Sequence, residues 1–256
     1  MSTDANSQAM ELFGTSSQTK KIAVGVILIA LYAVLALLPM SGFIGTAGLS
    51  SILSFAICVA PIIGIIMGPW KGFVFGLIAG IIATIVSLPF GGGVYLIIPT
   101  TIMGPAVAAL FTGLSLKRLT KVANTSIPGP LFTAIYLAIV IALYEIVVYE
   151  AWWFMLPYML AAIVAAVFQI KRFEFNPSRS YLQLIPFTFL GAMLDHSMMA
   201  MGSVYILQIP AAVFGFVIFP VMIVERIIAT LLGALLGFII LKIFGEEIGN
   251  SPSLEI

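Results

Sequence analysis

Residues 221–244 read VMIVERIIATLLGALLGFIILKIF, an apolar run that contains only one acidic and two basic side chains. As an α-helix this run would be about 36 Å long, at about 1.5 Å per residue. A helix crosses the hydrocarbon core of a bilayer with about 20 mostly apolar residues. The run therefore predicts a transmembrane helix that carries Glu225 and Arg226 within the membrane.

The composition of the whole chain agrees with this interpretation. Of its 256 residues, 62% are hydrophobic and only 8% are charged, and the formal net charge is +1. Soluble domains average about 25% charged residues. This composition excludes a soluble enzyme, a disordered chain and a nucleic-acid-binding protein, which would need a basic surface. The single cysteine, Cys58, excludes an internal disulfide framework.

The apolar runs predict an all-α, polytopic helical bundle with about eight transmembrane helices. A polar segment, residues 1–21, reads as a disordered cytoplasmic tail. A single membrane domain occupies residues 22–244, and residues 245–256 form a second cytoplasmic tail. The expected spans are Ile22–Pro39, Ser51–Gly68, Gly72–Leu88, Tyr95–Leu116, Pro130–Val148, Trp152–Ile170, Tyr181–Met201 and Val221–Phe244.

The basic residues predict the orientation of these spans. Cytoplasmic loops of membrane proteins carry an excess of Lys and Arg. With the N-terminus placed in the cytoplasm, all of the 11 Lys and Arg residues except Arg226 fall on the cytoplasmic side. This pattern predicts a multi-pass protein of the cell membrane with both termini inside. Residues 205–219 are interpreted as a re-entrant or interfacial segment bounded by Pro210 and Pro220.

Five ionisable side chains lie within the predicted spans or at their start: Glu145, Asp195, His196, Glu225 and Arg226. Counting about 1.5 Å per residue from the membrane edges places the three acids at one level in the outer half of the membrane. Such groups either bind a ligand or form a buried network that fixes helix register. Because successive helix residues point about 100° apart, Glu225 and Arg226 are not expected to face one axis together, and one of them is expected to reach the lipid headgroups.

Polar residues near the predicted outer surface extend this candidate substrate site. Three glycines at residues 91–93 suggest a loop that opens and closes over a pocket. Tyr95 follows this loop, and Thr100 and Thr101 are expected to donate hydrogen bonds into the same cavity. The run Asp195–Met201 also permits a metal-site interpretation, but it lacks a second histidine, so no metal is predicted.

Small residues predict close helix contacts. Gly64, Gly68, Gly72, Gly76 and Gly80 recur at every fourth position, and this spacing lets helix backbones approach in lipid. The row explains either packing within the chain or docking of a partner membrane subunit. The candidate docking residues are Gly72, Gly76, Gly80, Ala30 and Ala33.

Enzyme signatures are absent from the sequence. It contains no GxxxxGK[ST] phosphate loop, no HExxH zinc motif and no GxSxG nucleophile. The predicted cytoplasmic loops are also too short to fold as a catalytic domain. We therefore expect neither catalysis nor a cofactor.

Two motifs resemble the substrate-binding (S) components of energy-coupling factor transporters. The first is the turn Gly68-Pro69-Trp70-Lys71-Gly72, together with the glycine loop at 89–94 and the helix that follows it. The second is Phe219–Ile228, in which a proline and polar groups begin the last helix. The family commonly has six spans, so residues 130–170 would be an inserted pair of helices.

The resemblance implies a capture protein for a small molecule such as a vitamin, a precursor or a metal. It also implies a coupling membrane subunit and two cytoplasmic ATPases as partners, with membrane lipid around the bundle. In this interpretation Arg226 pairs with a ligand carboxylate or phosphate and the acids take an amine. Two alternatives remain open from the sequence: an ion-coupled secondary transporter that uses Glu145 and Asp195, and a non-transporting subunit of a membrane complex.

Overall fold

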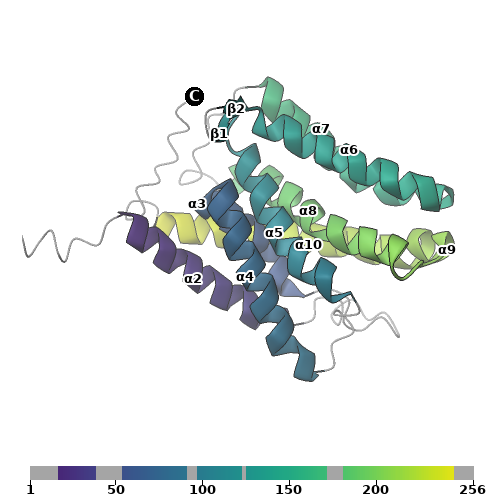
Figure 1. Ribbon diagram of the computed structural model, residues 1–256, viewed down its shortest axis with the longest axis horizontal. Helices are drawn as coiled ribbons and strands as arrows, with labels where there is room; N and C mark the ends of the chain where they lie inside the picture. The colour runs from purple at the N-terminus through teal and green to yellow at the C-terminus, as the bar shows by residue number, and fades with distance from the viewer. Residues whose placement is uncertain (1–16, 39–53, 91–96, 123–124, 172–180, 245–256) are drawn as a thin grey trace, which may run out of the picture.

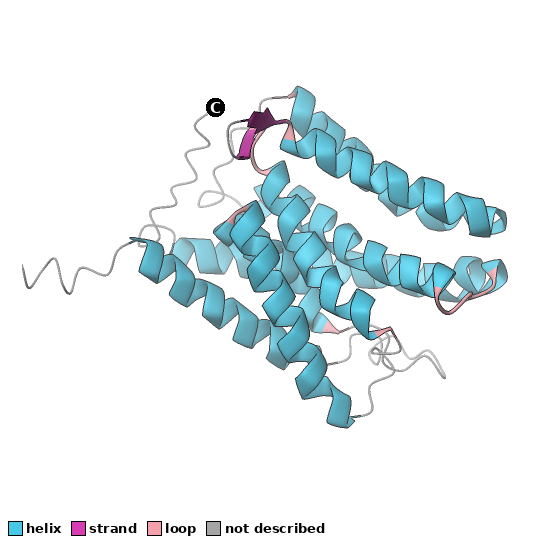
Figure 2. Cartoon of the chain, in the orientation of Figure 1, coloured by secondary structure: helices cyan, strands magenta, loops and turns pink. Residues whose placement is uncertain are grey.

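The computed structural model describes residues 17–38, 54–90, 97–122, 125–171 and 181–244. These residues are almost entirely helical (Figure 2). The β-structure in this part of the chain is a short antiparallel hairpin of β1 (Thr120–Val122) and β2 (Thr125–Ile127). The long helices are α2 (Ser17–Ala36), α4 (Pro69–Ser87), α5 (Ile98–Ser115), α6 (Gly129–Val148), α7 (Leu156–Ile170), α8 (Ile185–Tyr205) and α10 (Phe219–Phe244).

The chain is an all-α multi-pass membrane protein. Six helical segments of the described chain are long and apolar enough to cross a membrane. Their outward faces are apolar as well: the side chains of Ile146, Ile170 and Phe216 are 75%, 76% and 73% exposed. A helix of a soluble protein would carry polar residues on such a face. Lipid is the solvent that suits this surface.

Six segments, instead of the eight predicted spans, meet this criterion, and two features of the structure account for the difference. The first is that Gly129–Ile170, counted here as one apolar helical segment, is a helical hairpin. Helices α6 and α7 are joined by the 3₁₀ segment η5 (Tyr149–Met155), in which Ala151 has non-helical φ and ψ of −119° and 40°. The two helices pack side by side at one edge of the molecule (Figure 1).

The second feature is a short helix where a full span was expected. The predicted span Ser51–Gly68 is represented by the 3₁₀ turn η2 (Phe55–Cys58) and α3 (Ala60–Met67). Every residue of α3 is buried, and α3 packs against α2, α4, α5 and α8. It ends at Gly68, whose φ of +76° suits glycine, and Pro69 then begins α4. A helix buried on all sides is as apolar as one that faces lipid, so composition did not distinguish the two.

Helices α5 and α8 form the centre of the bundle. They are the most buried of the candidate spans. Helix α5 packs against α3, α4, α6 and α8, and α8 also contacts α6, α7 and α10 (Figure 1). Polar side chains on these two helices are therefore held away from lipid.

The glycine row brings α4 against α5. A Cβ atom added at Gly76 would lie 2.5 Å from the carbonyl oxygen of Pro105, and one added at Gly80 would lie 2.4 Å from that of Ile102. At Gly72 the nearest atom would be the Cα of Gly64, at 3.2 Å. These glycines thus face neighbouring helices of the same chain, as the packing interpretation expected.

The other candidate docking residues, on α2, lie on different faces of their helix. Ala30 is exposed, whereas Ala33 is buried. Residues three apart lie close together on the surface of a helix. Of these two alanines, however, only Ala30 faces outward. Helix α2 also begins at Ser17, five residues before the predicted start of the first span. Residues 1–16 lie outside the described chain.

The last helix is continuous where a division at Pro220 was expected. Pro210 precedes α9 (Ala211–Val213), the π-helical turn η7 (Phe214–Ile218) follows, and α10 then begins at Phe219. A proline ring clashes with the carbonyl four residues earlier in a regular α-helix. The wider π-helical turn lies directly before Pro220, where this clash would arise. Residues 211–244 therefore form one helical segment with a local defect.

Cationic side chains meet at one end of the bundle. Lys21, near the start of α2, interacts electrostatically with Lys71, at the start of α4, and with Lys117, just after α5. The sequence placed all three on one side of the membrane. The structure confirms that these three helix ends lie together.

Candidate functional site

The structure separates the adjacent residues Asp195 and His196 on α8. Both are buried, with exposed fractions of 6% and 5%. Asp195 faces a pocket between α2, η2, α4 and α5, whereas His196 faces the α6–α7 hairpin. Successive residues on a helix point about 100° apart, so neither side chain can join the other's surroundings.

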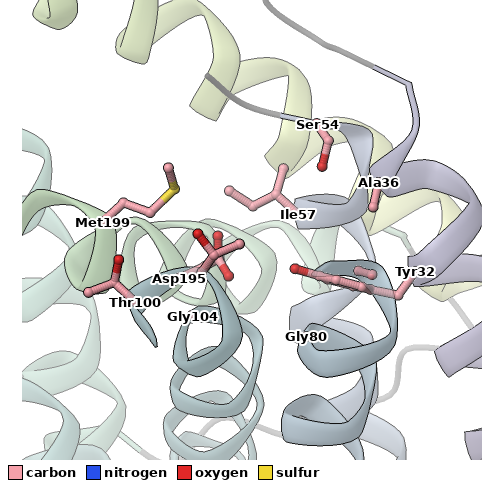
Figure 3. A pocket seen from close by; sticks show the side chains of 11 residues that line it. Tyr32, Ala36, Ser54, Ile57, Gly80, Thr100, Gly104, Asp195 and Met199 are labelled. Atoms are coloured by element: carbon pink, nitrogen blue, oxygen red, sulfur yellow. The ribbon is translucent and has the colours of Figure 1, made fainter. Parts of the chain in front are cut away.

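The pocket at Asp195 has a volume of about 30 Å³. Figure 3 shows the Asp195 carboxylate near its centre, between Tyr32 on one side and Thr100 and Met199 on the other. Ser54 and Ile57 lie above them in this view. Asp195 makes no hydrogen bond with any other residue that the structure describes. A buried carboxylate without a hydrogen-bond partner is costly, which makes Asp195 a candidate for contact with a ligand.

Gly104 on α5 makes room for this carboxylate. A Cβ atom added at Gly104 would lie 2.8 Å from Oδ1 of Asp195, which is closer than real Cβ contacts permit. Glycine at this point of α5 therefore leaves room for the Asp195 carboxylate beside the helix backbone. The sequence analysis did not single out Gly104, and a glycine directly before Pro105 in a helix is the signal that could have indicated it.

The threonine hydroxyls of the pocket are oriented differently from the prediction. The Oγ1 of Thr100 donates to the carbonyl of Ile97 at 3.0 Å, and the Oγ1 of Thr101 donates to the same carbonyl at 3.2 Å. A hydroxyl has one proton and two acceptor lone pairs. Both hydroxyls are directed to the backbone in this structure, and their donation to a ligand in the cavity stays a prediction.

Glu225 and Arg226 are both buried at the start of α10, at 1% and 2% exposure. The expectation that one of them would reach the lipid headgroups is wrong. Arg226 extends toward α8, where its Nη1 donates to the carbonyl of Ala192 at 3.2 Å. Its Nε and Nη2, and both carboxylate oxygens of Glu225, are buried without a hydrogen-bond partner.

Arg226 is close enough to four ionisable groups to interact with them electrostatically. Its strongest charge interaction is with Glu225, followed by those with Asp195, Tyr158 and Cys58. Arg226 does not line the pocket at Asp195. The predicted cluster is thus divided into Asp195 within the pocket and the Glu225–Arg226 pair behind it.

His196 is fixed by an aromatic side chain from the hairpin. The hydroxyl of Tyr158 on α7 lies 2.6 Å from Nδ1 of His196, and the two rings stack at 24°. Phe154 lies on the same side, with its ring centroid 6.0 Å from that of His196. The side chain of Tyr158 is itself fully buried. His196 therefore connects α8 to the hairpin and does not face the Asp195 pocket.

We expect the Tyr158→Phe variant to lose about 1–3 kcal/mol of unfolding free energy, because it leaves the buried Nδ1 of His196 without a partner. Thermal unfolding in detergent measures this loss. The matched control is Tyr144→Phe: Tyr144 is also buried, but its hydroxyl donates to Ala151 over a longer distance of 3.4 Å. Equal stability of the two variants would contradict the structural role of the His196 contact.

The remaining predicted residues do not join the pocket. Glu145 on α6 is partly buried next to Tyr144, and its Oε1 has no hydrogen-bond partner. It is not among the residues that line the Asp195 pocket. Tyr95 and the glycines at 91–93 lie outside the described residues. Of the predicted substrate site, the structure therefore places Asp195 and Thr100 together.

Tyr32, Ile57 and Met199 line the pocket but were not predicted as site residues. Each comes from an apolar run in which nothing distinguishes a pocket-lining side chain from a packing one. No group of three or more His, Cys, Asp or Glu side chains that could hold a metal occurs among the described residues. Comparison with known proteins matched no family model, no curated protein and no solved structure.

Proposed function

We propose that this protein is the substrate-capture subunit of an importer of the energy-coupling factor type, with its binding pocket at Asp195. The observation that carries the proposal is a buried carboxylate without a hydrogen-bond partner that faces a pocket inside a membrane bundle. The motifs around Gly68–Gly72 and Phe219–Ile228 support the choice of family. In this proposal a coupling membrane subunit and two ATPases in the plasma membrane complete the transporter.

The arrangement of the pocket favours capture. Its walls come from helices far apart in the sequence: Tyr32 on α2, Thr100 on α5 and Asp195 on α8. Each wall is held by close packing, as between α4 and α5, so the polar groups are positioned before a ligand arrives. Preorganised groups of this kind bind with less loss of conformational freedom. A pocket inside the bundle with a preformed charge suits retention of a solute.

Mass spectrometry of the protein purified from its own membranes in mild detergent tests this proposal. Co-purification of a second membrane protein with ATPase subunits, together with a retained small molecule, is the expected result. Isolation of the chain alone, with uptake in vesicles that collapses on addition of an uncoupler, would favour the secondary transporter. A stable complex without ATPases or a retained molecule would favour the scaffold.

Two carboxylate variants separate the capture subunit from the secondary transporter. We expect Asp195→Asn to lose the retained molecule by at least tenfold, because it removes the pocket charge while preserving the side-chain shape. Glu145→Gln is expected to retain it, since Glu145 lies away from the pocket. Quantitative mass spectrometry of equal amounts of each purified variant measures both. Loss of transport in Glu145→Gln, with retention in Asp195→Asn, would contradict the proposal and favour coupling through Glu145.

A further inference from the structure

We propose that the solute bound at Asp195 carries an organic ammonium group, whose N–H bonds are directed to the Asp195 carboxylate and to Thr100. This inference rests on the proposed capture function and names the chemical class of its substrate. It differs from the sequence-based interpretation, in which Arg226 would also bind a carboxylate or phosphate of the ligand.

The charge of the pocket is the first argument. Asp195 is the only acidic residue that lines it, and no basic residue lines it. Arg226, the nearest basic group by charge interaction, lies outside the lining and interacts most strongly with Glu225. With both acids and Arg226 ionised, these groups carry one excess negative charge. A ligand that enters the pocket therefore meets an uncompensated anion, which a cation would neutralise.

The hydrogen-bonding capacity of the wall is the second argument. Because Thr100 gives its hydroxyl proton to Ile97 in this structure, its Oγ1 is placed to accept a hydrogen bond from a ligand. The Asp195 carboxylate is also an acceptor when ionised. An ammonium group has N–H bonds for both. A carboxylate or phosphate could accept from the Tyr32 and Ser54 hydroxyls that also line the pocket, but it would lie beside the Asp195 carboxylate, and like charges repel.

The third argument is the character of the remaining wall. The pocket volume of about 30 Å³ accommodates a small polar head. Ile57, Ala36 and Met199 offer an apolar surface for a short carbon stem. The Tyr32 side chain extends into the same space with its hydroxyl oxygen toward Asp195 (Figure 3). This oxygen can accept a further N–H bond from the ligand.

A transition metal fits the same pocket poorly. Such ions take several His, Cys, Asp or Glu ligands, and no group of three of these occurs in the part of the chain that the structure describes. The hydroxyls of Tyr32, Ser54, Thr100 and Thr101 lie around the same carboxylate, so an alkali-metal ion is the competing occupant that the test below measures. An organic ammonium uses directional N–H bonds to these oxygens and also suits the apolar part of the wall.

The test uses the purified full chain in detergent and three probes of similar size: methylammonium chloride, acetamide and sodium acetate. All are measured at equal ionic strength. Thermal stabilisation and calorimetry report their binding. We expect methylammonium to bind at least tenfold more tightly than acetamide, and acetate to bind no better than acetamide. Sodium and potassium chloride are measured in parallel. Equal or tighter binding of acetate, acetamide or an alkali-metal ion would overturn the ammonium assignment.

Single substitutions test where methylammonium binds. Asp195→Asn is expected to weaken methylammonium binding at least tenfold, and Thr100→Val severalfold. Glu150→Gln, which removes an exposed acid in η5, is the matched control and is expected to bind as the wild type does. Wild-type affinity in Asp195→Asn would overturn the proposed position. If Asp195→Asn does not fold, the wild-type ranking of the three probes still decides the ligand class.

Failure of this inference differs from failure of the proposed function. A neutral or anionic molecule retained by the wild type and lost in Asp195→Asn would leave capture intact and overturn the ammonium class. Retention of the native molecule in Asp195→Asn, with no response to methylammonium, would overturn the capture site together with the ligand class.

Discussion

The Arg226→Met variant is expected to lose about 3–5 kcal/mol of unfolding free energy, because it removes the positive charge that interacts with the buried carboxylates of Glu225 and Asp195. Arg226 is 2% exposed, interacts with Glu225 and Asp195, and donates to the carbonyl of Ala192. Methionine has a similar length but supplies neither the charge nor the donor. Titration with sodium dodecyl sulfate in mixed micelles measures the unfolding free energy.

The control for this variant lies on the same helix. Lys242→Met removes a cation from the last turn of α10, where the ammonium lies 6.0 Å from the ring centroid of Phe238. We expect a loss below about 1 kcal/mol there, since exposed cation–π contacts are weak. The double variant Arg226→Met/Glu225→Gln should recover part of the stability, because it removes one of the uncompensated acids. Stability of Arg226→Met within 1 kcal/mol of the wild type would contradict the compensating role.

The Gly76→Ala variant is expected to lose about 1–2 kcal/mol, because its Cβ would lie 2.5 Å from the carbonyl oxygen of Pro105. The Cβ is attached directly to the α4 backbone and the carbonyl oxygen belongs to the α5 backbone. Neither atom can turn away, so α4 and α5 must separate. Overpacking of this kind costs about 1–3 kcal/mol or more and outweighs the gain of about 1 kcal/mol from replacing glycine in a helix. Thermal and detergent-induced unfolding both report the loss.

Gly237→Ala is the matched control, because glycine at 237 also lies inside a helix. Its added Cβ would meet side-chain atoms of Ile62 and Leu184 at 3.5 and 3.6 Å, which are ordinary contacts. We expect this variant to be as stable as the wild type or slightly more stable. If Gly76→Ala were as stable as Gly237→Ala, the close approach of α4 and α5 would be wrong.

The sequence predicted the class of this protein and the position of most helices. A charged content of 8% and long apolar runs are compatible only with a membrane bundle, because 21 charged residues cannot cover a soluble surface. The α6–α7 pair was also predicted, from a break in hydropathy at residues 149–151. These properties are local or additive along the chain, so no knowledge of neighbouring helices is needed to derive them.

The arrangement of the site could not be predicted in the same way. The periodicity of α8 shows that Asp195 and His196 point apart, but it does not show which neighbour each side chain meets. Similarly, Glu225 and Arg226 are both buried because α10 is covered at this turn by α8 and η2, which a single-helix projection does not include. A row of glycines likewise indicates a close contact without naming the partner.

The amino-acid sequence by itself determined that this protein lies in a membrane, is helical, and holds acids and an arginine within its spans. Solvation decides these properties, and each residue contributes to it almost independently. Only the tertiary structure decided that α3 is an internal helix, that Gly104 makes room for Asp195, and that Arg226 lies behind the pocket. Those outcomes depend on contacts between side chains that are far apart in the sequence, and steric exclusion between packed helices selects among them.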